Sequence, residues 1–136
     1  MHSDLTESVR NIEYSINGIL QRLLLSVLPG CRFTVNLGKD DRNIALHFDP
    51  RFNFLGGIKK IFMATRNDGE WGHQHQDDNF PFYWGKQVEI MIAFLGDTFE
   101  INLSTGHRIV FQNSLKMEIL TYMSVANMTV SDIKFC

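Results

Sequence analysis

Residues 47–52 alternate polar and apolar side chains in a pattern that could build a binding surface. His47, Asp49 and Arg51 would share one face of a strand there, because successive strand residues point to opposite sides. Trp71, followed by Gly72, adds a flat apolar ring farther along the chain. A sugar has a C–H-rich face that stacks on such a ring, and hydroxyl groups that need polar partners once they lose water. An imidazole, a carboxylate and a guanidinium beside one exposed ring therefore predict a carbohydrate-binding face.

Short segments with strand character occupy most of the chain, and turn residues separate them. The turn residues lie at 29–30, 38–41, 56–57, 67–69, 85, 96–97 and 105–106. Strands are predicted over residues 20–27, 32–37, 43–51, 60–65, 87–94, 98–103, 108–111 and 128–135. The first of these could be taken for a helix on its leucines alone, and residues 114–122 could hold one helical turn. Many short strands with regular turns indicate an all-β sandwich or barrel.

Length and composition narrow the class of protein. The 136 residues fit one domain, spanning 1–136, that can bury a core without disulfides or metals. A net charge of −2 gives no reason to expect nucleic acid as a partner. The polar start of the chain is not a signal peptide, and its apolar segments are too short for membrane insertion. Two cysteines, Cys31 and Cys136, do not make a disulfide framework and are predicted to be free thiols.

Four motifs resemble those of the galectins, the β-galactoside-binding lectins. The galectin motifs read H-x-N-P-R, V-x-N, W-G-x-E-x-R and F-P-F. The corresponding segments are His47-Phe48-Asp49-Pro50-Arg51, Phe62-Met63-Ala64, Trp71-Gly72-His73-Gln74-His75-Gln76 and Phe80-Pro81-Phe82. The resemblance runs from about Val9 to the end of the chain, and residues 33–38, 106–107 and 120–123 also fit it.

The resemblance implies both a fold and a function. A galectin-like chain would fold as a jelly-roll β-sandwich of two antiparallel sheets, one of them concave and carrying the sugar. It would be a single-domain, prototype-type lectin that binds β-galactoside glycans or glycoproteins, without catalysis and without a cofactor. Galectins are found in the cytoplasm and, by non-classical secretion, outside the cell.

Prototype galectins often form homodimers through terminal strands. Residues 11–16 and 128–135 alternate polar and apolar side chains as edge strands do. An unprotected edge favours pairing with a second copy, so a two-fold dimer is expected here. A monomer is the alternative.

The resemblance assigns roles to three preserved residues. His47 corresponds to the galectin histidine that binds the axial O4 of galactose. Arg51 corresponds to an arginine whose planar guanidinium reaches a hydroxyl and a ring oxygen, and Trp71 to the stacking ring. The ordinary alternatives are a half-buried strand histidine, a solvated arginine and a core tryptophan.

Four positions depart from the galectin motifs. Asp49 replaces an asparagine, and its ionised carboxylate accepts hydrogen bonds but cannot donate them. It could instead bind Arg51 and hold this side chain in place. Ala64 replaces a second asparagine and has no polar atom. Gln74 and Gln76 replace a glutamate and an arginine, and keep hydrogen-bonding groups without their charges. The predicted carbohydrate-binding residues are His47, Asp49, Arg51, Trp71, Gln74 and Gln76. The four replacements predict that galactoside binding is weakened or altered in specificity. A galectin fold that has lost lactose binding and acts through protein–protein contacts is the alternative.

Catalysis has little support in the sequence. A glycosidase needs two positioned carboxylates. Asp49 is the carboxylate of the alternating face, whereas Glu70, Asp77 and Asp78 are expected in loops. We therefore predict no catalytic site.

A metal site is not predicted either. His73 and His75 alternate with the two glutamines, so in a strand they would share the face opposite those glutamines. A zinc site needs three or four ligands, which makes a solvated pair of histidines the better interpretation.

Overall fold

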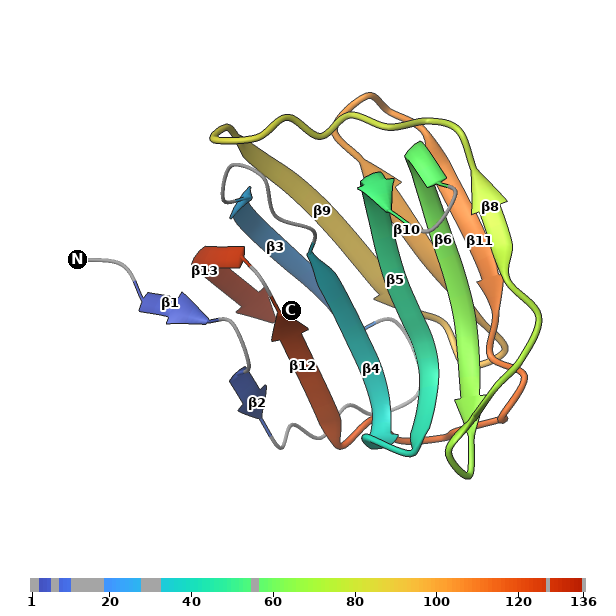
Figure 1. The fold of residues 1–136 in the computed structure, drawn as a ribbon. Helices are drawn as coiled ribbons and strands as arrows, with labels where there is room; N and C mark the ends of the chain where they lie inside the picture. The colour runs from blue at the N-terminus through green and yellow to red at the C-terminus, as the bar shows by residue number, and fades with distance from the viewer. Residues whose placement is uncertain are drawn as a thin grey trace.

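A computed structural model of the chain describes residues 3–5, 8–10, 19–27, 33–54, 57–126 and 128–135. Its strands form two antiparallel sheets that lie against each other (Figure 1). In chain order the strands are β1 (Ser3–Leu5), β2 (Ser8–Arg10), β3 (Ile19–Val27), β4 (Thr34–Asp40), β5 (Asn43–Phe54), β6 (Gly57–Asn67), β7 (Glu70–Trp71), β8 (His75–Asp77), β9 (Gln87–Phe94), β10 (Thr98–Leu103), β11 (Arg108–Gln112), β12 (Tyr122–Ala126) and β13 (Met128–Phe135). The predicted all-β fold of two antiparallel sheets is confirmed.

The two sheets draw their strands from distant parts of the chain. The six-stranded sheet has the order β1-β13-β3-β9-β10-β11. The seven-stranded sheet has the order β2-β12-β4-β5-β6-β7, and β8 also pairs with β6. Figure 1 shows β4, β5 and β6 as one layer in front of β3, β9 and β10. The N-terminal β1 and β2 pair with the C-terminal β13 and β12, so both ends of the chain lie on the same side of the sandwich.

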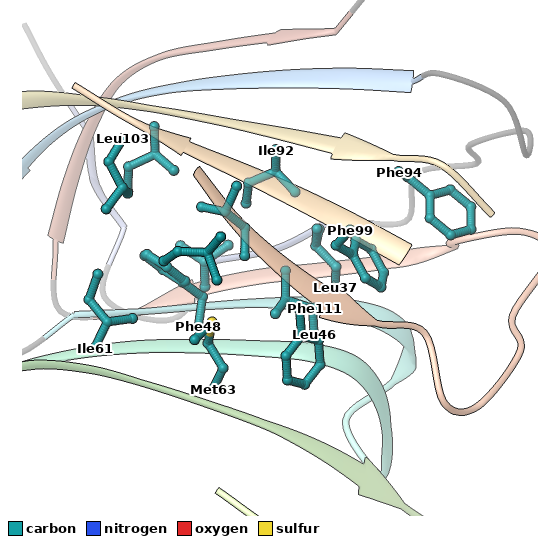
Figure 2. Packing of buried hydrophobic residues seen from close by; sticks show 14 of the residues in the cluster. Leu37, Leu46, Phe48, Ile61, Met63, Ile92, Phe94, Phe99, Leu103 and Phe111 are labelled. Atoms are coloured by element: carbon teal, nitrogen blue, oxygen red, sulfur yellow. The ribbon is translucent and has the colours of Figure 1, made fainter. Parts of the chain in front are cut away.

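Apolar side chains from both sheets fill the space between them. Every second residue of β9 and β10 is buried, as the strand period requires. Figure 2 shows Phe48 of β5, Ile92 of β9 and Phe99 of β10 within this layer. Burying one such side chain fully contributes roughly 1.5–3 kcal/mol. Because Leu46 and Phe48 face the core, the polar residues that alternate with them on β5 face the outside of the sandwich.

Each predicted strand has a counterpart in the structure, although boundaries differ. Residues 20–27 belong to strand β3, which decides against the helical alternative. The strands predicted at 43–51 and 60–65 are longer and form β5 and β6. Five strands were not predicted: β1, β2, β7, β8 and β12. Four of them have two or three residues, or lie at the N-terminus, and are too short for an alternating pattern to be recognised.

The helical turn considered for residues 114–122 is wrong. This segment instead wraps around Asn113, whose side chain is almost completely buried. The Asn113 amide donates to the carbonyls of Gly96 and Met117 at 2.8 and 2.9 Å, and its oxygen accepts from Met117 N at 3.3 Å. Lys116 adopts a φ of 54°, which a right-handed helix does not allow. A buried amide therefore organises these residues into turns.

Some predictions fall outside the described residues. They concern the candidate edge strand at 11–16 and the two cysteines, Cys31 and Cys136. The other terminal strand, β13, is confirmed and lies next to the edge strand β1. In the part of the chain that the structure describes, no helix has the length and apolar character needed to cross a membrane.

Candidate carbohydrate-binding site

A row of residues crosses the outer face of the seven-stranded sheet. In the pairing register, Asn36 of β4 lies opposite His47 of β5 and also opposite Ser124 of β12. On its other side, His47 lies opposite Ala64 of β6. Side chains of directly opposed residues point to the same face of a sheet. These four residues therefore form one continuous row across β12, β4, β5 and β6.

Hydrogen bonds within the row fix the orientation of the His47 ring. Asn36 Nδ2 donates to Ser124 Oγ at 3.0 Å. This leaves Asn36 Oδ1 to accept a hydrogen bond from the N–H group of His47 Nδ1. With Nδ1 carrying the hydrogen, Nε2 of a neutral imidazole is an acceptor. The row therefore holds His47 ready to accept a hydrogen bond from a hydroxyl group.

Asp49 and Arg51 form a buried ion pair next to this row. Arg51 Nε donates to Asp49 Oδ2 at 2.9 Å, and the two side chains are 8% and 1% exposed. Asp49 Oδ2 also lies 3.7 Å from His47 Nε2. The guanidinium carbon of Arg51 is 3.9 Å from the centre of the Phe62 ring, which is a cation–π contact. The contact between Asp49 and Arg51 suggested by the sequence is present, and it draws the guanidinium down onto Phe62.

Trp71 of β7 is the exposed ring of the site. Its exposed fraction is 49%, which rules out the core alternative. The ring centres of Trp71 and His47 are 4.6 Å apart at an angle of 51°. Arg66 of β6 lies opposite Trp71, and its guanidinium carbon is 5.2 Å from the indole centre. The predicted combination of an aromatic plate and a polar edge therefore exists on one face.

The two glutamines lie at the margin of the site. Gln76 of β8 is opposite Phe62, which is itself opposite Asp49, so Gln76 shares the outer face of the sheet. Gln74 is exposed between β7 and β8. Ala64 is buried beside His47 and adds no polar group. The site is therefore polar along β4 and β5, and uncharged along β8.

His75 points away from this site, as predicted for the face opposite the glutamines. Its ring lies 5.6 Å from that of Phe111 on β11 and 5.1 Å from that of His73. Among the residues that the structure describes, no group of three or more His, Cys, Asp or Glu is arranged to hold a metal ion.

The expectation that Glu70 and Asp77 lie in loops is wrong. They belong to β7 and β8, because both short segments pair with β6. Asp77 Oδ2 is 2.8 Å from His107 Nε2, and Asp78 Oδ1 is 3.7 Å from Lys60 Nζ. The Asp77 and Asp78 carboxylates therefore contact basic side chains, and Asp49 is bonded to Arg51.

Sequence reasoning missed Asn36, Ser124 and Phe62. Asn36 and Ser124 lie at polar positions of their strands, but no local signal shows that these strands lie beside β5. Phe62 faces outward between the core residues Ile61 and Met63, and alternation could have indicated this.

Galactoside-binding lectins are similar to this chain in both sequence and structure. A family model described as galactoside-binding lectin matches residues 13–135. Galectin-1 of Mus musculus is 44% identical over 92 residues, which cover 68% of each chain. The structure is similar to CG-16, a homodimeric agglutinin from chicken liver, with a TM-score of 0.89 and 30% identity over 96% of this chain and 99% of that one. It is also similar to toad ovary galectin in complex with N-acetylgalactose, with a TM-score of 0.90 and 25% identity over 95% of this chain and 97% of that one.

Proposed function

The chain belongs to the galectin family, and from this membership we propose that it is a non-enzymatic lectin for β-galactoside-containing glycans, with weakened or altered specificity. The observation that carries the proposal is the position of Trp71. Its exposed ring lies 4.6 Å from the ring of His47, whose orientation Asn36 fixes. A galactose ring placed here would stack on the indole and direct its O4 hydroxyl to the imidazole.

Weak binding is proposed because several polar contacts of the family site are replaced. Ala64 has no polar atom, and Gln74 and Gln76 have no charge. Arg51 is preserved, but its guanidinium is bonded to Asp49 and covers Phe62. Hydrogen bonds to charged groups contribute about 1.5–3 kcal/mol, against about 1 kcal/mol for neutral ones. Each loss of about 1.4 kcal/mol lowers the affinity tenfold.

We expect lactose to bind more weakly than micromolar, or not to bind. Isothermal titration calorimetry of the purified protein with lactose measures this. A His47→Ala variant identifies any heat that does not come from the site. Micromolar binding that disappears in the variant would show that the replaced residues matter less than we propose.

A galectin fold that acts through protein contacts is the alternative, favoured by the buried Asp49–Arg51 pair. A glycan array followed by tryptophan fluorescence distinguishes the two functions. Because the chain also contains Trp84, the fluorescence of Trp71 is read in a Trp84→Phe variant. A glycan that binds on the array and changes this fluorescence supports the lectin. The absence of binding to every glycan on a broad array supports the protein-binding alternative.

We also propose a two-fold homodimer, which would present two sugar sites and increase avidity. The described strands β1 and β2 occupy the edges of the two sheets, where a second copy could pair. Light scattering at micromolar concentration should give about twice the chain mass of 15.7 kDa. Reducing buffer excludes a disulfide through Cys136. A mass equal to that of one chain would reject the dimer.

A further inference from the structure

A groove runs along the side of the sandwich opposite to β1 and β2. It lies between β7 and β8 of one sheet and β11 of the other, and its volume is about 1000 Å³. Figure 1 shows β8 and β11 along this same side of the molecule. Met63, His75 and Phe111 belong to its lining, and the rings of His75 and Phe111 are 5.6 Å apart. The groove also borders the candidate sugar site, because Trp71 and Gln76 line it as well.

The backbone of β11 has a free edge beside this groove. Among the described strands, β11 pairs only with β10. Leu103 N donates to His107 O at 2.9 Å, and Asn113 N donates to Asp97 O at 2.9 Å. Hydrogen-bonded pairs recur at every second residue of an antiparallel ladder. Ile109 and Phe111 therefore bond to β10, while the N–H and C=O groups of Arg108, Val110 and Gln112 point away from it.

Three of the features that prevent strand addition are absent from this edge, although it is five residues long and begins with Arg108. Proteins protect edge strands with proline, bulges or an inward-pointing charge. β11 reads Arg-Ile-Val-Phe-Gln, it pairs with β10 without a register shift, and Val110 at its centre is 54% exposed. Its inward side chains, Ile109 and Phe111, are apolar and buried. An extended segment could therefore add to β11 by ordinary antiparallel or parallel pairing.

The charge of the groove indicates the kind of segment. The wall formed by β6, β7 and β8 carries Asp68, Glu70 and Asp77. Asp68 lies 3.2 Å from Arg42 and Asp77 lies 2.8 Å from His107, so Glu70 contributes the negative charge that is least offset by a basic neighbour. On the opposite side, Arg108 lies 3.2 Å from Glu100. A second copy of the chain, with its net charge of −2, would place two acidic walls together.

We infer that the edge of β11 and the adjoining groove bind an extended basic segment of a partner protein by β-strand addition. Its backbone would bond to Val110, and alternate side chains would enter the groove. Lysine or arginine among these side chains would lie near Glu70 and Asp77. The groove shares Trp71 and Gln76 with the candidate sugar site, whereas the β11 edge belongs to the other sheet.

Fluorescence anisotropy with a labelled peptide of alternating lysine and valine tests this inference. The peptide should bind, and a matched peptide of alternating glutamate and valine should not. Glu70→Gln should weaken binding, whereas Glu118→Gln, which changes an exposed carboxylate outside the groove lining, should not. Equal binding of the two peptides, or equal loss of binding in Glu70→Gln and Glu118→Gln, would overturn the inference.

Val110→Pro tests the role of the backbone. It removes an outward N–H without removing a bond to β10, and should weaken the lysine peptide about three- to tenfold. Val110→Ala shortens the same side chain, keeps the N–H, and is the matched control. N-methylation of alternate peptide amides in both possible registers gives the same test without changing the protein. Undiminished binding in Val110→Pro and with the N-methylated peptides, or a dimer that Val110→Pro dissociates, would exclude a peptide site at this edge.

Discussion

The variant Ala64→Asn/Gln74→Glu/Gln76→Arg is expected to bind lactose about 10- to 100-fold more tightly than the natural chain. Position 64 lies opposite His47, so an asparagine there would extend the polar row toward β8. Position 76 lies opposite Phe62, close to the Arg51 guanidinium that covers this ring. A glutamate at 74 would supply the negative charge that holds arginines 51 and 76 toward the sugar. Calorimetry with lactose measures the gain.

Two controls show whether the gain comes from the proposed site. His47→Ala in the triple variant should remove the gained affinity, because it removes the partner of O4. Gln112→Glu, on β11 of the other sheet, should leave the affinity of the natural chain unchanged. A triple variant that binds no better than the natural chain would mean that the Asp49–Arg51 pair or the β7–β8 segment blocks the site. Adding Asp49→Asn then separates these two causes.

Asp49→Ala is expected to lower the free energy of unfolding by about 3–5 kcal/mol. The variant leaves the Arg51 guanidinium, whose side chain is 8% exposed, without its bonded carboxylate. This loss is large compared with a total stability of about 5–15 kcal/mol for a domain. Urea unfolding followed by tryptophan fluorescence measures the change.

The exposed pair Arg42–Asp68 provides the matched control. Its atoms are 3.2 Å apart, but the side chains are 60% and 87% exposed. Asp68→Ala should therefore change stability by less than about 1 kcal/mol. The double variant Asp49→Ala/Arg51→Met should recover part of the loss, because it also removes the buried charge. Equal effects of Asp49→Ala and Asp68→Ala would contradict a structural role for the buried pair.

Local patterns of residues were enough to predict the character of most strands and the composition of the site. Alternation along β5 places His47, Asp49 and Arg51 on one face, because neighbouring strand residues always point to opposite sides. The same period accounts for the alternating burial along β9 and β10. Alternation also predicted that the side chains of His75 and Gln76 point to opposite faces of the sheet, which the structure confirms. These properties depend on backbone geometry within one segment.

Tertiary structure alone decided which segments lie side by side. Asn36 and Ser124 are 88 positions apart, yet their side chains bond to each other because β4 and β12 pair. The burial of Arg51 depends on Phe62, which the pairing of β5 with β6 brings beneath it. The turns at 114–122 depend on the burial of Asn113 against Gly96. Strand order and the pairing of distant strands follow from the packing of the whole chain, so no pattern within one segment could determine them.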